Sequence, residues 1–94
     1  MVIGIATIEL HIPDNGSLKG KRRVVKSLIA KLRREYNVAA AEVDANDAWQ
    51  RAVIGLATVS NSDQHAHSVL MHAIRAMERW RLDAEVVDYQ IEML

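Results

Sequence analysis

Residues 2–36, VIGIATIELHIPDNGSLKGKRRVVKSLIAKLRREY, contain the change of pattern that decides the fold. The stretch 2–10 is rich in β-branched side chains, and it passes from continuously apolar to alternating at its end. This pattern predicts a strand in the centre of a sheet. The segment from His11 to Gly16 holds the only proline of the chain and an Asn-Gly pair, so it predicts a turn.

A helix is expected after this turn. Ser17 stands where an N-cap is wanted, and the apolar residues between Leu18 and Tyr36 fall within about 100° of a helical wheel. Asn37 then ends the pattern, and we expect it to adopt a left-handed conformation. The glycine at position 20 leaves open whether the helix begins here or a few residues later.

The rest of the chain predicts three more strands and a second helix. The strands are expected over residues 38–43, 49–60 and 84–94, the helix over 64–82 after capping oxygens at 61–63, and a hairpin loop over 44–47. Strict alternation in the last strand places Val87 on its apolar side and Val86 on its polar side. The order β-α-β-β-α-β predicts one α+β domain over residues 1–94, a ferredoxin-like split βαβ fold. Its four-stranded antiparallel sheet has the order 4-1-3-2, with both helices on one face.

The composition excludes several classes of site and of protein. The chain has 94 residues, half of them hydrophobic, and no cysteine, which excludes disulfides, zinc knuckles, iron–sulfur clusters and thiol nucleophiles and suits a reducing cytoplasm. Stretches free of charged residues are too short to span a bilayer, and the chain starts without the pattern of a signal peptide. We expect a cytoplasmic protein without a cofactor.

The charges are distributed unevenly. Twelve basic and twelve acidic residues give a net charge of zero, but residues 1–37 sum to +5 and residues 38–94 to −5. Six cations fall on one side of the first helix, opposite its apolar arc, and we call them the basic face: Lys19, Arg22, Arg23, Lys26, Arg33 and Arg34. Several of these cations oppose the helix macrodipole, so stability alone does not account for them.

A helix N-terminus beside several cations suits a phosphate. The candidate nucleic-acid or anion-binding residues are Ser17, Lys19, Lys21, Arg22, Arg23, Lys26, Arg33 and Arg34. A solvated helix face that only keeps the protein in solution is the simpler alternative. Trp49 and Arg51 are candidate secondary contacts to a base or a partner, although Trp49 is better interpreted as an anchor of the hairpin in the core.

The open face of the sheet is expected to lack the aromatic platform of RNA-recognition modules, because the first strand offers Ile3, Ile5 and Thr7 there. Aliphatic and acidic residues on this face favour contact with protein, including homodimerisation through this face or along an edge strand. Plain exposure of the face to solvent is the alternative.

No catalytic or metal-binding constellation is evident. His65, His67 and His72 lack the spacing that joins two imidazoles on a helix, so we expect no metal site. Glu42, Asp44 and Asp47 could hold a cation, but turn capping explains them more simply. Ser17 is better explained as a helix cap than as a nucleophile. The loop before the first helix also lacks the Gly-x-Val-x-Gly-Val cradle of acylphosphatases, which weighs against an enzyme that handles phosphate.

Several motifs are specific enough to indicate a family. They are His11-Ile12-Pro13, Ser17-Leu18-Lys19-Gly20-Lys21-Arg22-Arg23, Ala41-Glu42-Val43-Asp44 and Trp49-Gln50-Arg51. The chain resembles the YlxP-like family, domain of unknown function 503, over almost its whole length. The resemblance implies a small bacterial cytosolic protein of ferredoxin-like fold with no established catalytic residues. Genes of the family often lie near those for transcription elongation, translation initiation and ribosome maturation factors.

The leading hypothesis is thus a non-enzymatic accessory protein that docks RNA or ribosomal-particle phosphates through the first helix. The alternative is a protein-interaction or homodimerisation module, and the third is a small phosphate-handling enzyme.

Overall fold

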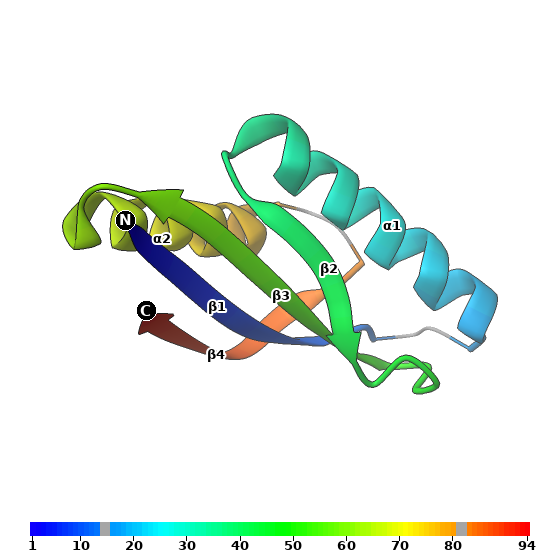
Figure 1. Cartoon of the computed structure of the whole chain (residues 1–94). Helices are drawn as coiled ribbons and strands as arrows, with labels where there is room; N and C mark the ends of the chain where they lie inside the picture. The colour runs from blue at the N-terminus through cyan, green and yellow to red at the C-terminus, as the bar shows by residue number, and fades with distance from the viewer. Residues whose placement is uncertain (14–15, 81–82) are drawn as a thin grey trace.

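The computed structural model describes residues 1–13, 16–80 and 83–94. Its elements are β1 (Val2–His11), α1 (Leu18–Glu35), β2 (Ala39–Asp44), β3 (Arg51–Ser60), α2 (Asp63–Arg79) and β4 (Glu85–Met93). The predicted order β-α-β-β-α-β is confirmed (Figure 1). Within the described residues, neither helix is both long and apolar enough to cross a membrane.

The four strands form one antiparallel sheet in the order β2-β3-β1-β4, which is the predicted order read from the other edge. β1 is central and pairs with β3 and β4, so that Ile8 lies between Ile54 and Tyr89. α2 packs against β1, β3 and β4, whereas α1 packs against β2, at one edge of the sheet. Figure 1 shows α1 following the length of β2. The fold is therefore the ferredoxin-like arrangement expected from the sequence.

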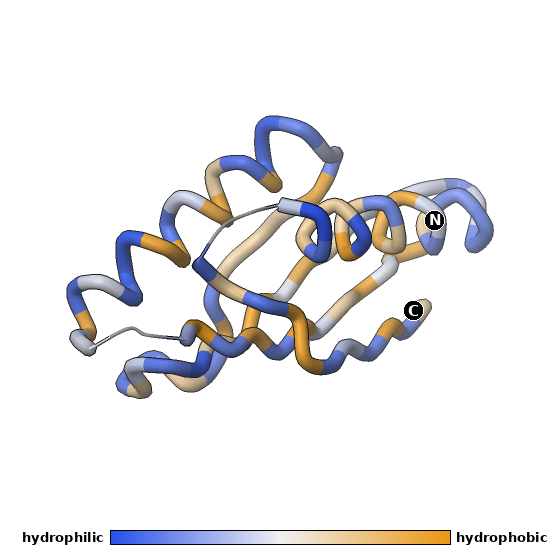
Figure 2. The backbone as a smooth tube through the Cα atoms, turned by 180° about the vertical axis from the view of Figure 1, so that it is seen from behind, coloured by the Kyte–Doolittle hydropathy of each residue, from blue (hydrophilic) through white to orange (hydrophobic). Residues whose placement is uncertain are grey.

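The core lies between the helices and the inner face of the sheet. Buried aliphatic side chains come from every second position of the two central strands and from one stripe of each helix. They include Ala6, Ile8, Leu10, Ala52, Ile54, Leu56, Val25, Leu28, Leu32, Leu70, Ala73, Ile74 and Met77. In Figure 2, the apolar stripe of α1 appears as orange segments between blue, hydrophilic ones. Burial of this apolar surface stabilises the domain without a disulfide.

Two serine caps fix where the helices begin. Ser17 Oγ accepts a hydrogen bond from the Gly20 backbone N–H at 3.0 Å, and Ser62 Oγ accepts one from the His65 N–H at 3.3 Å. Both caps agree with the sequence, and α1 begins at Leu18 despite the glycine at position 20.

Some expected boundaries differ from the structure. The left-handed conformation expected at Asn37 is wrong, because Ala45, with φ of 61°, is the one non-glycine residue with positive φ in the described part of the chain. β3 begins at Arg51 rather than at position 49. Residues 14 and 15 of the expected turn, and residues 81 and 82 at the expected end of the second helix, lie outside the described residues.

β4 contains a bulge that the alternation of its sequence conceals. Glu9 of β1 pairs with Asp88, but the next residue, Leu10, pairs with Val86, so that Val87 is an extra residue in β4. The expected faces of the two valines are therefore wrong. Val86 packs against the core, and Val87 is 54% exposed. A bulge inserts one residue and so reverses the sidedness of a period-two pattern beyond it.

Candidate functional site

The basic face of α1 is open to solvent. Its six side chains, Lys19, Arg22, Arg23, Lys26, Arg33 and Arg34, are all exposed. Arg33 donates a hydrogen bond from Nη2 to the backbone carbonyl of Ala40 at 2.6 Å. Among the described residues, none of the six forms an ion pair with a carboxylate. The helix thus presents six cations that the rest of the described chain does not neutralise.

The position of these charges opposes the field of the helix. α1 has no acidic residue in its first turn, where the macrodipole is positive. Lys19 adds positive charge within that turn, and Arg22 follows directly after it. Arg33 and Arg34 lie in the last turn, where cations are favourable. The summed potential over the first half of α1 therefore favours an anion.

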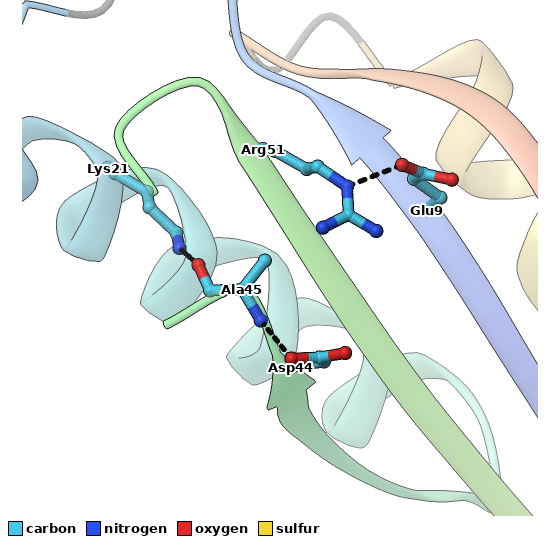
Figure 3. A network of polar contacts seen from close by, with 5 residues as sticks. All are labelled: Glu9, Lys21, Asp44, Ala45 and Arg51. Carbon is cyan, nitrogen blue, oxygen red and sulfur yellow. Dashed lines mark hydrogen bonds and ion pairs between the residues drawn. The ribbon is translucent and has the colours of Figure 1, made fainter. Parts of the chain in front are cut away.

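Lys21 does not belong to this surface. Its side chain is fully buried, with Nζ 2.7 Å from Glu42 Oε2, and it donates a hydrogen bond to the Ala45 carbonyl (Figure 3). The Glu42 side chain is only 16% exposed. The expectation that Lys21 contacts an external anion is wrong, because its ammonium group already has two internal partners.

The burial of Lys21 has a signal in the sequence. Positions 21, 25, 28 and 32 follow the spacing of one helical stripe, and Val25, Leu28 and Leu32 are buried. Because lysine is charged, Lys21 was included among the candidate anion-binding residues although position 21 belongs to the buried stripe. The contacts of Lys21 have a structural consequence. The ion pair joins the first turn of α1 to Glu42 of β2, and the hydrogen bond joins it to Ala45 in the loop that follows β2.

A trough lies between α1 and β2, and it has a volume of about 520 Å³. We define the trough by its lining residues, Arg22, Val25, Lys26, Ile29, Ala30 and Arg33 from α1 and Ala41 and Glu42 from β2. Half of the basic face, Arg22, Lys26 and Arg33, borders it. Sequence reasoning identified these three cations but not the hollow beside them, because the position of β2 relative to α1 depends on the tertiary structure.

The candidate secondary contacts lie elsewhere. Arg51 is on the open face of the sheet, opposite the helices, where its Nε donates to Glu9 Oε1 at 2.5 Å (Figure 3). This hydrogen bond and the charge of Glu9 raise the pKa of Arg51 above its ordinary value. Trp49 is 55% exposed in the β2–β3 connection, so the interpretation that it anchors the hairpin in the core is wrong. The structure therefore does not bring Arg51 together with the basic face.

The open face of the sheet has an apolar and a polar part. An apolar hollow of about 310 Å³ is bordered by Ile5, Ala57 and Val43, and a more polar hollow of about 250 Å³ by Glu9 and Asp88. Val59 and Val43 are more than half exposed. Self-association through this face stays a prediction.

Local contacts account for two of the three acidic residues that surround the hairpin loop. Glu42 pairs with Lys21, and Asp44 Oδ1 accepts a hydrogen bond from the Ala45 N–H at 2.7 Å. Within residues 1–13, 16–80 and 83–94, no three histidine or acidic side chains lie close enough together to hold a metal ion. His11 pairs with Glu85 at 2.8 Å instead.

Comparisons with known proteins identify the family and a similar fold. "Uncharacterized protein YlxP" of Bacillus subtilis is 43% identical over 61 residues, which cover 65% of this chain and 66% of that protein. The alignment thus spans slightly less than two thirds of the relative's length. Protein SO0527 from Shewanella oneidensis has a TM-score of 0.54 at 15% identity, over 97% of this chain and 88% of that one, a likeness of fold alone. A family described as "Protein of unknown function (DUF503)" matches residues 3–91. The chain therefore belongs to the DUF503 family.

Proposed function

We propose that this protein is a non-enzymatic cytoplasmic accessory protein that docks on the phosphates of RNA, as free structured RNA or within a ribosomal particle. The observation that carries the proposal is the basic face of α1, six exposed cations without a carboxylate partner among the described residues. Phosphate contacts from Lys and Arg supply most of the affinity of proteins for nucleic-acid backbones. A surface of this kind fits that chemistry better than it fits a catalytic site.

The number of cations sets the expected salt dependence. Six contacts correspond to a slope of about −4 for log K against log [salt] with single-stranded RNA. A fourfold rise in salt would then weaken binding by roughly two orders of magnitude. Binding of this type is steep in salt and tolerant of sequence.

The orientation of the complex follows from the remaining charges. Asp88 and Glu92 are exposed on β4, far from α1 in the order of the sheet. These carboxylates repel phosphate, so RNA approaches from the side of α1 and the open face of the sheet stays turned away. On the open face, β1 contributes Ile3, Ile5 and Thr7, and none of these three is an aromatic residue on which a base could stack.

The experiment compares two charge reversals of equal size. Arg22→Glu/Arg23→Glu alters the basic face, and Arg75→Glu/Arg79→Glu makes the same change of net charge at exposed positions of α2. We expect the α1 variant to lose RNA and ribosomal-subunit binding at least tenfold, while the α2 variant changes it much less. Equal losses in the two variants, or binding that does not respond to salt, would contradict the proposal.

The apolar hollow on the open face favours a second candidate function, a homodimer formed through the sheet. Val59 is 58% exposed and lies on the same face of β3 as Ala57, which borders this hollow. Solvent-exposed apolar patches of this kind commonly mark protein contacts. Sedimentation of the protein with and without Val59→Lys tests it. A mass that rises with concentration, and that the substitution returns to the monomer, supports the dimer, whereas a monomer at every concentration refutes it.

A further inference from the structure

The trough between α1 and β2 has an elongated shape set by the spacing of its α1 residues. Positions 22, 25, 26, 29, 30 and 33 follow a single helical stripe that spans twelve residues, or eleven steps along the helix. At about 1.5 Å of rise per residue, the stripe is about 16 Å long. The trough is therefore long enough for a short extended segment rather than for a single ion.

The lining combines cations with apolar side chains. Arg22, Lys26 and Arg33 carry the positive charges, and Val25 and Ile29 contribute apolar surface that is buried or half-buried. A ligand that matches this arrangement has anionic groups next to an uncharged, flat or apolar part. Phosphate alone would use only the cations.

The carboxylate in the lining does not cancel this preference. Glu42 Oε2 lies 2.7 Å from the buried Lys21 ammonium, which compensates its charge. Charge complementarity therefore still favours an anion. The site is also held in place, because the same ion pair connects α1 to β2, and because Arg33 donates to the Ala40 carbonyl of β2 at 2.6 Å. A preformed site avoids part of the ordering cost of binding.

We propose that the trough binds an unpaired nucleotide of RNA, with the base against the apolar side chains and the neighbouring phosphates on Arg22, Lys26 and Arg33. This inference rests on the proposed RNA docking. An unpaired base can be turned out of its strand and buried in a protein, whereas the bases of a duplex are stacked inside it. The trough thus gives the basic face a preference for single-stranded segments or loops.

Ala30 offers a way to test the trough without altering charge. Its side chain is exposed and lines the trough, and a larger side chain there would occupy the space. Ala30→Leu fills the trough and keeps a good helix former. Ser27→Leu is the matched control, since Ser27 is exposed on the same helix but is not part of the lining.

The measurement is the affinity of the full chain for a labelled single-stranded RNA and for the corresponding duplex, at one salt concentration. We expect the single strand to bind about tenfold more tightly, because apolar contact with an unpaired base adds to the phosphate contacts. Ala30→Leu should remove this preference and Ser27→Leu should retain it. Methyl resonances of Val25, Ile29 and Ala30 should shift when the single strand binds to the unaltered protein.

The outcomes separate this inference from the proposed function. Equal affinity for single strand and duplex, or a preference that Ala30→Leu leaves unchanged, overturns the trough assignment while salt-dependent RNA docking stands. The absence of binding to both RNAs overturns both proposals. If a poly-glutamate peptide binds, and Ala30→Leu abolishes that binding without affecting RNA, the trough is a site for acidic peptides and the inference is wrong.

Discussion

Replacement of Lys21 by methionine should destabilise the protein strongly, although the substitution removes a charge from a helix rich in cations. Methionine keeps the length and most of the apolar stem of lysine. It removes the ammonium group that contacts Glu42 Oε2 at 2.7 Å and donates to the Ala45 carbonyl. The variant therefore leaves a carboxylate that is only 16% exposed without its counter-ion.

The burial of Glu42 sets the expected loss in the free energy of unfolding. Removal of one partner of a buried ion pair typically costs about 3–5 kcal/mol, and the residual exposure of Glu42 places the expected loss near the lower end, at about 3 kcal/mol. For a domain of this size, that loss corresponds to a fall of roughly 12–24 °C in Tm. Lys21→Met/Glu42→Met removes both charges and should recover stability to within about 1–2 kcal/mol of the parent, since the Ala45 carbonyl still lacks a donor.

Urea denaturation, followed by far-UV circular dichroism, measures all of these free energies of unfolding. Lys19→Met serves as the control, because it removes an equal charge from an exposed neighbouring position of α1 and should change stability by less than about 0.5 kcal/mol. The reasoning fails if Lys21→Met costs no more than Lys19→Met. It also fails if the double variant is no more stable than Lys21→Met alone, since the two charges would then not be coupled.

Two further substitutions test local packing and capping. Gly55→Ala should lower the free energy of unfolding by about 1–2 kcal/mol, because the new Cβ would lie 2.8 Å from Val43 Cγ1. Adding Val43→Ala to the same chain should restore stability. An unchanged urea midpoint for Gly55→Ala would contradict the close approach. Ser17→Ala should lower the free energy of unfolding by about 1 kcal/mol, because the Gly20 N–H loses its acceptor. Ser17→Asp should retain most of the parent stability, because aspartate also caps helices. Thermal melting of both variants decides whether Ser17 acts as the cap.

The order of elements and the strand order could be predicted because local pattern and topology rules determine them. Ser17 was recognisable as a cap from its position before an apolar helical stripe, and the second cap, Ser62, lies within the predicted capping segment 61–63. The bulge at Val87 was not predictable, since an inserted residue leaves the alternation of the sequence intact and is visible only in the pairing with β1.

The candidate site was predicted in part. The exposed cations of the basic face follow from the helical wheel, whose period is fixed by the backbone. Lys21 was wrongly included, because the pattern of charged residues says nothing about a partner 21 positions away, Glu42, which the tertiary fold brings within 2.7 Å. Trp49 was wrongly expected in the core for a related reason, since the packing of a loop depends on its tertiary neighbours.

The two edges of the sheet are protected against pairing with another chain in different ways. At β2, the Ala40 carbonyl already accepts a hydrogen bond from Arg33, and α1 lies alongside the strand. At β4, the bulge at Val87 interrupts the regular spacing that an incoming strand would need, and Asp88 and Glu92 add like charges. β2 and β4 each pair with a strand on one side only. The protein should nevertheless resist edge-to-edge aggregation at high concentration.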